Sequence, residues 1–428
     1  MKTYLYVTPF FPTPTSWRGA YSYDFIRALQ RVLAAKKSAG GEKWRIVVLK
    51  EGKGADYEIG GVSVYTFRAL RMPSNIFPNL FARVNQRSFL TTVCRLGVNL
   101  DDVCVCHANV ANYGIYPLAV KKANPSCMTI LQHHDLQSFG LNMGVLCHCW
   151  LYNLIQFLVL RAMHEKIDVH VFISEASRRS FLMAPDTSWT QYPHYKKQMR
   201  WLPWRPVKIE NSVILHNGVD RSIFTPGDSG DRDTIPIENR KFVIGCVGNF
   251  QVLKDQKTLV EAVGILMRKG KCAQIWRGGL KVIFVGSGET LAVCKAEAEK
   301  LHAMSLHWLE FEFMEEMPHE KLVCFYRGLD LFVLPSWFEG FGCVCVEAYS
   351  SGVPFITCEG QGLDDLFYTE DRDRWLCKQR DPDDLAHKID DCICSLAAGR
   401  MFEQRLAKDL DIDVLVGDFV KELDLNCH

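Results

Sequence analysis

Strand-like apolar runs alternate with helical patterns along this chain, and the alternation occurs twice. The runs of the first half are rich in β-branched and aromatic residues and lie at 2–10, 44–50, 62–67, 102–108, 128–134 and 169–174. Those of the second half lie at 241–250, 280–288 and 329–336. Helical patterns follow several of these runs, at 21–40, 255–270 and 289–304. Such alternation predicts parallel sheets with right-handed crossovers. The chain is therefore expected to contain two Rossmann-like α/β domains.

The length of the chain, 428 residues, exceeds what one hydrophobic core usually serves, which also favours two domains. A segment rich in Gly, Pro and Asp separates the two alternations at 215–236. We therefore expect an N-terminal domain at 1–215 and a C-terminal domain at 216–404. A C-terminal helix at about 405–428 can pack back on the N-terminal domain.

Charge and hydropathy exclude several classes of protein. The formal net charge is +1, which gives no general reason to expect nucleic acid as a partner. The first residues lack the apolar core and cleavage site of a signal peptide. The longest apolar stretch, 149–163, is interrupted by Asn153 and Gln156 and is too short to span a bilayer. We expect a cytoplasmic protein without a transmembrane segment.

The chain contains seventeen cysteines, and four C-x-C pairs stand out among them: Cys104/Cys106, Cys147/Cys149, Cys343/Cys345 and Cys392/Cys394. None has the C-x2-C spacing of a zinc knuckle. Free buried thiols that act as small hydrophobic side chains are the favoured interpretation. Metal ligation or disulfide formation is the alternative. We expect no metal site and no cofactor.

Ligands of open α/β sheets bind beyond the carboxyl ends of the strands, where loops lead into helices. Four loops at such positions carry unusual residues: 11–22, 249–254, 286–289 and 335–352. The last of them reads PSWFEGFGCVCVEAYSSG, with two glutamates, Glu339 and Glu347, around a glycine-rich turn. This loop is the best candidate for a binding site.

The residue types of this loop indicate the chemistry of the ligand. Gly340 and Gly342 permit a tight turn and close approach of the backbone. A helix that starts at about Cys343 would direct its free N–H groups and positive dipole end at a phosphate or diphosphate. Glu339 would repel a phosphate, so it is expected to accept hydrogen bonds from hydroxyls. Glu347 could bind ribose hydroxyls in the way of acidic residues in dinucleotide folds. A ligand that has a diphosphate in the middle and hydroxyls at both ends is a sugar nucleotide.

The motif E-G-F-G-x-x-x-x-E-A at 339–348 resembles the E-x7-E signature of retaining glycosyltransferases of the GT-B fold, glycosyltransferase family 4. Other segments match that family in the same order and cover most of residues 100–360: ISEASRRSF, ILHNGVDRSIFTP, VGNFQVLKDQKTLVEAV, FVGSGE and YRGLDLFVLPS. The resemblance implies the GT-B architecture, with two Rossmann-like domains facing each other across a cleft. The N-terminal domain would take the acceptor and the C-terminal domain the donor.

The resemblance also implies a reaction and a set of site residues. A hexosyl unit would pass, with retention and without a metal ion, from a UDP- or GDP-linked sugar to a carbohydrate or lipid-linked acceptor, in cell-surface polysaccharide or glycolipid synthesis. The catalytic residues would be His134, Glu339 and Lys254. The residues that bind the nucleotide sugar would be Gly19, Asn249, Lys254, Gly286, Gly288, Gly340, Phe341, Gly342, Cys343 and Glu347.

Two positions depart from the family pattern. Where the family usually has a Gly-Gly pair, this chain has Gly19 and Ala20. Many members carry an arginine where Asn249 stands, so Lys254 would hold the diphosphate without it unless Arg18 or a backbone amide compensates. Taken singly, Lys254 could also be a solvated surface charge.

Other assignments also have alternatives. Glu347 could serve only to complement a helix dipole. His107 and His133 rank below His134 as the residue that faces the sugar, and any of these histidines could be buried for structural reasons. At the level of function, the alternatives are an epimerase or phosphorylase of the same fold, or a non-catalytic binder of nucleotide sugars.

The segment 183–208 combines three tryptophans and two tyrosines with five Lys/Arg residues and one Asp. Four prolines and the absence of a clear period predict a loop. It could be a folded surface insertion, an interfacial patch that contacts anionic headgroups, or a platform for an acceptor sugar. The second interpretation would place the protein peripherally on the inner face of the membrane.

Overall fold

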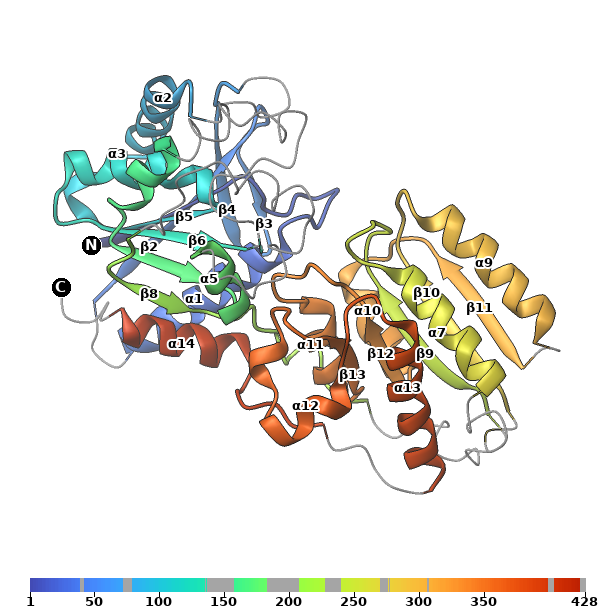
Figure 1. Cartoon of the computed structure of the whole chain (residues 1–428). Coiled ribbons are helices and arrows are strands. Elements are labelled where there is room, and N and C mark those ends of the chain that lie inside the picture. Colours follow the sequence, from blue (N-terminus) through green and yellow to red (C-terminus); the bar gives the residue numbers. More distant parts are fainter. Residues whose placement is uncertain are drawn as a thin grey trace. The chain divides into compact units, whose positions relative to one another are not determined.

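The computed structural model divides the chain into two compact units. Unit 1 consists of Met1–Gly218 and Asp411–His428, and unit 2 consists of Val219–Leu410. Each is an α/β unit with its own sheet (Figure 1). The structure describes residues 1–38, 42–71, 79–134, 136, 158–182, 208–227, 240–269, 276, 278–305, 308–398 and 404–423.

The sheet of unit 1 has eight strands in the order β3-β4-β2-β1-β5-β6-β7-β8. They are β1 (Lys2–Thr8), β2 (Trp44–Glu51), β3 (Tyr57–Ile59), β4 (Val62–Phe67), β5 (Val103–Asn109), β6 (Met128–His133), β7 (Val169–Phe172) and β8 (Ser212–Ile214). Only β3 pairs in antiparallel fashion, with β4. The other pairings are parallel, as strand–helix alternation predicts.

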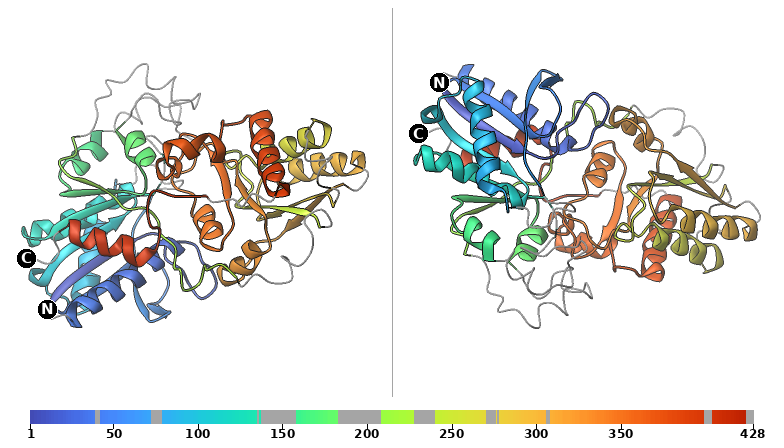
Figure 2. Two further views of the ribbon diagram at one scale, coloured as in Figure 1. Left: turned by 90° about the horizontal axis from the view of Figure 1, so that it is seen from below. Right: turned by 90° about the horizontal axis from the view of Figure 1, so that it is seen from above.

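Helices of unit 1 cover both faces of this sheet. They are α1 (Ala20–Ser38), α2 (Ala82–Arg95), α3 (Ile115–Ala123), α5 (Glu175–Phe181) and α14 (Ile412–Glu422), with 3-10 turns η2 (Leu100–Asp102) and η3 (Ala111–Gly114). Strand β1 illustrates the two faces: Leu5 and Val7 pack in one core with α2 and α3, and Tyr4 and Tyr6 pack in another with α1 and α14. The C-terminal helix α14 lies beside α1 (Figure 2).

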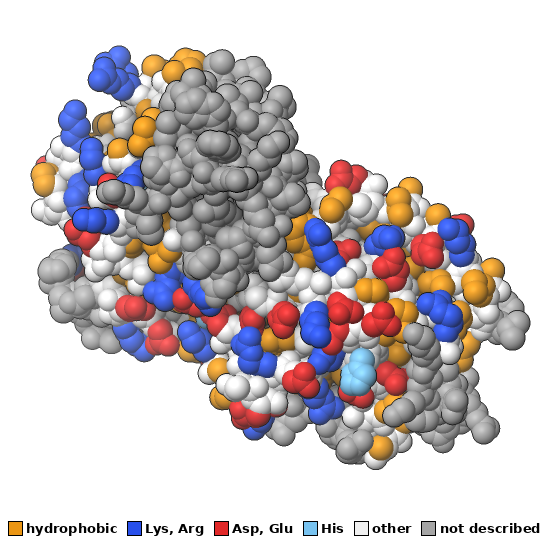
Figure 3. Space-filling view, in the orientation of Figure 1, with side chains coloured by type: hydrophobic (Ala, Val, Ile, Leu, Met, Phe, Trp, Pro, Cys, Tyr) orange, Lys and Arg blue, Asp and Glu red, His pale blue; other side chains and the backbone are white. Residues whose placement is uncertain are grey.

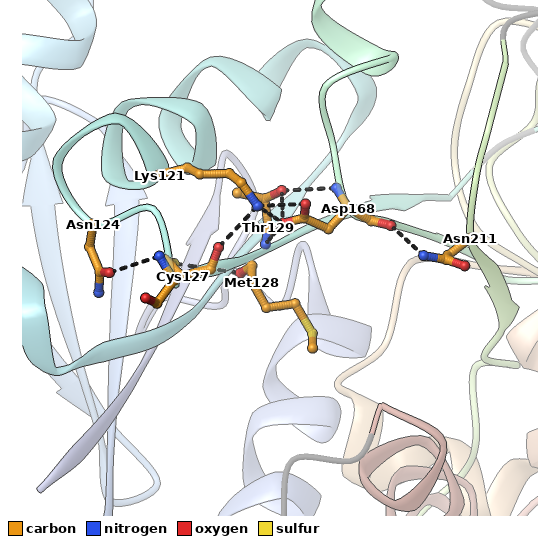
Figure 4. Close-up of polar contacts among 8 residues, drawn as sticks. Lys121, Asn124, Cys127, Met128, Thr129, Asp168 and Asn211 are labelled. Carbon is orange, nitrogen blue, oxygen red and sulfur yellow. Dashed lines mark hydrogen bonds and ion pairs between the residues drawn. The ribbon is translucent and has the colours of Figure 1, made fainter. Parts of the chain in front are cut away.

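A polar network fixes the register of β6 against β7 (Figure 4). The carboxylate of Asp168, just before β7, accepts hydrogen bonds from the backbone N–H and the hydroxyl of Thr129, both at 2.8 Å. The Thr129 hydroxyl in turn accepts from the Asp168 N–H at 3.0 Å. Lys121 contacts both carboxylate oxygens at 2.5 Å. Since the hydrogen bonds run both ways, a slip of either strand by one residue would break several of them at once.

The sheet of unit 2 has six parallel strands in the order β11-β10-β9-β12-β13-β14. They are β9 (Phe242–Val247), β10 (Leu280–Val285), β11 (Leu309–Met314), β12 (Leu331–Leu334), β13 (Phe355–Cys358) and β14 (Leu376–Cys377). The helices are α7 (Gln256–Lys269), α9 (Leu291–Met304), α10 (His319–Arg327), α11 (Cys343–Ser350), η6 (Asp364–Leu366), α12 (Thr369–Trp375) and α13 (Pro382–Ala397). The expectation of two Rossmann-like domains is confirmed.

Several features of the sequence reappear in the structure. The described cysteines are all free, as expected, but Cys94 and Cys324 are exposed rather than buried. Among the described residues, no helix is long and apolar enough to cross a membrane. On the face of the molecule that Figure 3 presents, Lys and Arg side chains are interspersed with Asp and Glu, in keeping with 50 basic and 49 acidic residues. Most of the apolar stretch 149–163 and residues 183–207 of the tryptophan-rich segment lie outside the described residues.

Candidate functional site

The strand order of unit 2 reverses between β9 and β12. From β9 the chain proceeds outward through β10 to β11, and it then returns to place β12 on the other side of β9. At such a switch point, the loops that leave the two neighbouring strands diverge and open a crevice at the carboxyl edge of the sheet. The two loops here are 248–255 and 335–342. They contain Lys254 and Glu339, so the topology alone places both side chains at the expected ligand edge.

Three hydrogen bonds hold these two loops together. The Ser336 hydroxyl and the Trp337 backbone N–H both donate to the Leu253 carbonyl, at 3.0 and 3.2 Å. The Trp337 indole N–H donates to the Val252 carbonyl at 3.0 Å. These contacts fix the backbone immediately before Lys254, and they place its ammonium group beside the loop that contains Glu339.

Lys254 and Glu339 form an ion pair, with Nζ of the lysine on Oε2 of the glutamate. Their side chains are 27% and 14% exposed, so the pair is partly screened by solvent but not freely hydrated. Burial acts to lower the pKa of Lys254, but the Glu339 carboxylate outweighs it, and the net shift of the pKa is upward. Lys254 is therefore a fixed positive charge at neutral pH. The two residues were predicted in one site, but their direct pairing was not predicted.

The backbone of Glu339 is held from a third loop. Its N–H donates to the side-chain carbonyl of Gln361 at 2.7 Å, and its C=O accepts from the Gly362 N–H at 3.0 Å. A Cβ atom at Gly362 would lie 1.9 Å from the Gly340 carbonyl oxygen, so no larger residue fits there. The loop after β13 thus fixes the direction in which the Glu339 side chain leaves the backbone.

Helix α11 begins directly after this loop. Gly342 is its N-cap and adopts a φ of +92°, which favours glycine strongly. Glycine has no side chain that could accept from the first-turn N–H groups, and the first turn of α11 contains no acidic residue. Phe341 is buried and Cys343 is half-buried, so both would meet a ligand through their backbone. This end of the helix is suited to an anion.

Glu347 lies one turn further into α11 and is buried. Its Oε2 accepts a hydrogen bond from the Tyr326 hydroxyl at 2.7 Å, and its Oε1 lies 3.3 Å from Nε2 of His319. Both partners come from α10. Burial, followed by the Glu347 carboxylate, raises the pKa of Tyr326 well above its ordinary value, so the phenol stays protonated and donates. The carboxylate is held in one orientation and keeps lone pairs for further donors.

The glycines of the β10–α9 loop have a packing role that the sequence did not reveal. Gly286 has a φ of +139°, and a Cβ there would lie 2.3 Å from the Gly248 carbonyl oxygen. A Cβ at Gly288 would lie 2.4 Å from the Phe250 carbonyl oxygen. These glycines let the β10 loop contact the β9 loop through its backbone. Asn249 lies in that β9 loop, where its carbonyl oxygen accepts from the Gln256 side chain at 3.0 Å.

In unit 1, Gly19 and His134 lie on loops that follow β1 and β6. Gly19 has a φ of +88°, and a Cβ there would lie 2.6 Å from the Phe10 carbonyl oxygen, so glycine is required immediately before α1. His134 is half-buried, with both ring nitrogens buried, and its ring lies 4.3 Å from that of Tyr21, centroid to centroid. It borders a cavity of about 10 Å³, room for one water at most. No described residue hydrogen-bonds either nitrogen of the His134 ring.

The lower-ranked histidines of unit 1 lie in its core. His107 on β5 is fully buried, and its Nδ1 is 2.7 Å from the Tyr4 hydroxyl. Burial, followed by the neighbouring His134, lowers the pKa of His107 to about 3. His133, at the end of β6, forms a hydrogen bond with His170. Arg18, considered as a substitute for the missing arginine, lies over the Phe10 ring of unit 1 at 4.3 Å.

Sequence reasoning missed the residues that support the site. They are Ser336, Trp337, Gln361, Tyr326 and His319. Ser336 and Trp337 were visible inside the quoted loop, where a polar residue and an indole follow a buried strand directly. No local pattern pointed to the other three, because they are distant in sequence from the quoted loop. Gln361 lies in the loop after β13, and Tyr326 and His319 lie in α10.

Two parallel α/β units, with charged residues and a helix N-terminus at the switch point of the second, are the arrangement expected of the GT-B fold. Residues 229–397 match the family model for glycosyl transferases group 1. The matched residues include the whole site of unit 2. The resemblance inferred from the sequence is confirmed.

The matches to individual curated proteins cover less than half of the chain. A D-inositol 3-phosphate glycosyltransferase of Mycobacteroides abscessus is 28% identical over 196 residues, 45% of this chain and 41% of that protein. The match to a second such enzyme, of Kribbella flavida, covers 37% of that protein. The chain thus spans about two fifths of the length of these curated relatives.

Solved structures resemble the chain over its whole length. A UDP-forming α,α-trehalose-phosphate synthase of Burkholderia xenovorans has a TM-score of 0.65 at 13% identity, with 100% of both chains covered. Anabaena HepE in complex with UDP has a TM-score of 0.58 at 15% identity, covering 99% of this chain and 100% of HepE. At these identities the likeness concerns the fold.

Proposed function

We propose that this protein is a retaining glycosyltransferase that moves a hexosyl unit from a nucleotide sugar to a carbohydrate or lipid-linked acceptor. One observation carries the proposal: Lys254, Glu339 and the N-terminus of α11 meet at the switch point of unit 2, within the segment matched by the glycosyl transferases group 1 model. The site combines a fixed cation, a helix end and carboxylates, which is the set a sugar nucleotide requires.

The donor diphosphate would bind against the first turn of α11 and Lys254. Because Lys254 is paired with Glu339 in this structure, the diphosphate must take the lysine from the glutamate. Glu339 would then be released to accept hydrogen bonds from hydroxyls of the transferred sugar. The ion pair thus makes the two events interdependent: the sugar site gains its free carboxylate when the diphosphate site is filled.

Lys254 would also act during bond cleavage. As the bond from the sugar to the diphosphate breaks, negative charge grows on the leaving phosphate oxygen, and a fixed lysine stabilises that charge without a metal ion. The departing phosphate would assist attack of the acceptor hydroxyl from the same face, which retains the configuration at the sugar carbon. A retaining hydrolase would instead need two carboxyl groups about 5–5.5 Å apart across the glycosidic bond.

The nucleoside would be held by Glu347. Its carboxylate, oriented by Tyr326 and His319, would accept from the ribose hydroxyls. HepE was solved with UDP, and the trehalose-phosphate synthase is described as UDP-forming. These relatives favour UDP over GDP as the leaving group in this proposal.

His134 would face the transferred sugar from unit 1. The proposal is supported by the burial of both ring nitrogens of His134, which no described residue hydrogen-bonds. A buried polar group of that kind calls for a ligand or water. A His134→Ala variant should lower kcat and leave nucleoside diphosphate affinity unchanged, and equal loss of both would remove this assignment.

One experiment separates the proposed function from its alternatives. The purified chain is incubated with UDP- and GDP-sugars, with and without candidate acceptor glycans, and the products are separated and identified. A glycosylated acceptor and a free nucleoside diphosphate support transfer. An altered sugar nucleotide would indicate epimerisation, consumption of phosphate would indicate a phosphorylase, and binding without reaction would indicate a sensor. Omitting Mg²⁺ and Mn²⁺ should leave the rate unchanged if the mechanism is metal-independent.

A cytoplasmic location and peripheral membrane contact through 183–208 remain part of the proposal, supported by composition alone. If this segment binds lipid, the protein should sediment with anionic vesicles and dissociate as salt is raised. Salt weakens the attraction between basic side chains and anionic headgroups, since the Debye length is only about 10 Å at 0.1 M. Serine substitutions at Trp189, Trp201 and Trp204 should reduce sedimentation. Failure to sediment at low salt would favour a water-soluble acceptor.

A further inference from the structure

Three buried histidines converge in the core of unit 1, and one of them, His133, directly precedes His134. His133 ends β6, His170 lies in β7, and His164 ends the helical residues 158–164. One ring nitrogen of each lies within 4.8 Å of the other two. Among the described residues this is the one group of His, Cys, Asp or Glu side chains with the geometry to hold a metal ion.

The strand register creates this convergence. In the parallel pair, Leu131 lies opposite His170 and His133 lies opposite Phe172. Side chains two residues apart point to the same face of a sheet, so His133 and His170 are diagonal neighbours on one face. The Asp168 network described above sets this register at the start of both strands (Figure 4).

Hydrogen bonds to backbone carbonyls determine which nitrogens carry lone pairs. Nε2 of His170 lies 3.1 Å from the His164 carbonyl, and Nε2 of His164 lies 3.0 Å from the Ala111 carbonyl. A carbonyl only accepts, so both Nε2 atoms are protonated and both Nδ1 atoms are the basic nitrogens of neutral rings. Imidazoles that bind a metal through one nitrogen and donate the other N–H to a backbone carbonyl are the usual arrangement in metal sites.

The third ring completes the set. Nε2 of His133 lies 3.0 Å from Nδ1 of His170. Two nitrogens bound to one Zn²⁺ at about 2.0–2.1 Å in tetrahedral geometry would be about 3.3 Å apart, so small shifts would suffice. Since the lone pair of His170 points at His133, the His133 Nε2 atom is the donor in this hydrogen bond. Metal binding would move that proton to Nδ1 of the same ring and leave the net charge of the ring unchanged.

The surroundings keep the three rings neutral. The His133 ring stacks on that of Phe172 at 4.6 Å and lies 4.5 Å from that of Phe181. Burial is the largest cause that lowers the pKa of all three histidines, to about 4 for His170 and well below the ordinary value for the other two. Neutral imidazole is the form that binds metals, so these rings need lose no proton to solvent first.

We propose that His133 Nε2, His164 Nδ1 and His170 Nδ1 form a binding site for a divalent transition-metal ion of the Zn²⁺ type. Three neutral nitrogen ligands favour zinc and its neighbours over Mg²⁺ or Ca²⁺, which prefer oxygen ligands. Three protein ligands leave at least one tetrahedral position for a further ligand such as water. The ion would tie β6, β7 and the end of the helical residues 158–164 to one another. This proposal does not depend on the proposed transfer reaction.

The test is zinc binding by the full chain, stripped with a chelator and then titrated with Zn²⁺ against a competing chromophoric chelator. We expect one tightly bound ion per chain, and replacement by Co²⁺ should give the visible absorption of a four-coordinate nitrogen site. His164→Gln should lower the zinc affinity at least 100-fold. The matched control is His107→Gln, which alters another fully buried histidine of unit 1 and should leave zinc affinity unchanged.

The chain has seventeen cysteines, and cysteine thiolates also bind zinc. The test must therefore identify the atoms that bind the ion. X-ray absorption of the zinc-loaded wild-type chain needs no variant to fold, and it should show a first shell of nitrogen or oxygen at about 2.0–2.1 Å. Sulfur in that shell, no retained zinc, or equal affinity in wild type and a folded His164→Gln variant would each overturn the proposal. In the last two cases the three rings would be a hydrogen-bonded part of the core only.

Discussion

The two units share one architecture, yet they treat ionisable side chains near the carboxyl ends of their strands in opposite ways. In unit 2, Lys254 and Glu339 are partly exposed and form an ion pair, and the glutamate raises the pKa of Lys254. In unit 1, His107 is buried, and His134 is half-buried with both ring nitrogens buried. No described residue pairs either ring with an opposite charge, and burial lowers the pKa of each to about 3. The same region of the same kind of sheet therefore presents fixed charge in one unit and neutral imidazole in the other.

The difference shows what decides the protonation state in a buried crevice. A charge stays ionised where a partner compensates its lost hydration, and an isolated group becomes neutral instead. Unit 2 is accordingly suited to bind an anion by exchanging one partner of Lys254 for another. Unit 1 is suited to ligands that interact with uncharged nitrogen atoms.

The strongest challenge to this comparison is removal of the fixed cation. Lys254→Met keeps the length of the side chain and removes the charge that would offset the departing diphosphate. We expect kcat with the donor to fall by roughly 10²–10³, the range for loss of one electrostatic donor. The matched control is Lys257→Met, at the start of α7, where the lysine is 53% exposed and paired with Glu261. Equal kcat in both variants would mean that Lys254 is only a structural partner of Glu339.

The next prediction concerns the other half of the ion pair. Glu339→Gln removes the charge that competes for Lys254 and keeps the side-chain shape. Turnover should fall by about 10- to 100-fold, the equivalent of a lost hydrogen bond to a charged group. Affinity for the free nucleoside diphosphate, measured by calorimetry, should stay equal or increase. Weaker nucleotide binding would show that Glu339 does not compete with the diphosphate.

The sequence predicted much of unit 2 because the relevant information is local there. Strand–helix alternation gives the parallel sheet, and the spacing from Glu339 to Glu347 spans one loop and one helical turn. Strand β11 was not predicted, although LEFEFM alternates with period two and could have been found. The pairing of Lys254 with Glu339 had no local signal, because it depends on hydrogen bonds between loops about 85 residues apart.

The histidine cluster of unit 1 was beyond such reasoning for the same physical cause. His133 was considered alone, as a candidate to face the sugar, and His164 and His170 were not considered. Their meeting depends on strand register, which Thr129 and Asp168 fix through contacts across 39 residues. Neither the period nor the composition of these strands specifies that register.

The third prediction concerns Glu347, the buried carboxylate of the unit 2 site. Glu347→Gln should weaken nucleoside diphosphate binding by about 1–3 kcal/mol if its carboxylate accepts from the ribose. Tyr326→Phe removes one donor to that carboxylate and leaves the charge, so it should cost less, at most about 1 kcal/mol of affinity. Calorimetry on both variants measures the two effects. Unchanged affinity in Glu347→Gln would leave Glu347 as a structural acceptor for α10.

The smallest expected effect is in unit 1 and concerns the pH dependence of stability. The pKa of His107 is about 3 in the folded chain and 6.5 ordinarily, so between these values the unfolded chain binds more protons. The free energy of unfolding should therefore decrease as the pH falls below 6.5, and the stability from this group is lost progressively down to about pH 3. Tyr4 and Tyr6 also contact the ring, but burial raises their pKa values, so both stay neutral in this range.

The other buried histidines contribute in the same direction, so a difference between two chains isolates His107. Denaturant unfolding is compared at pH 6.5 and 5.5 for wild type and His107→Gln, in chelator to exclude metal effects. The wild type should lose about 1 kcal/mol more than the variant over this single pH unit. Equal losses would mean that His107 titrates at its ordinary pKa in the folded chain. In that case unit 1 would hold a charge at this position, and the contrast with unit 2 would not extend to His107.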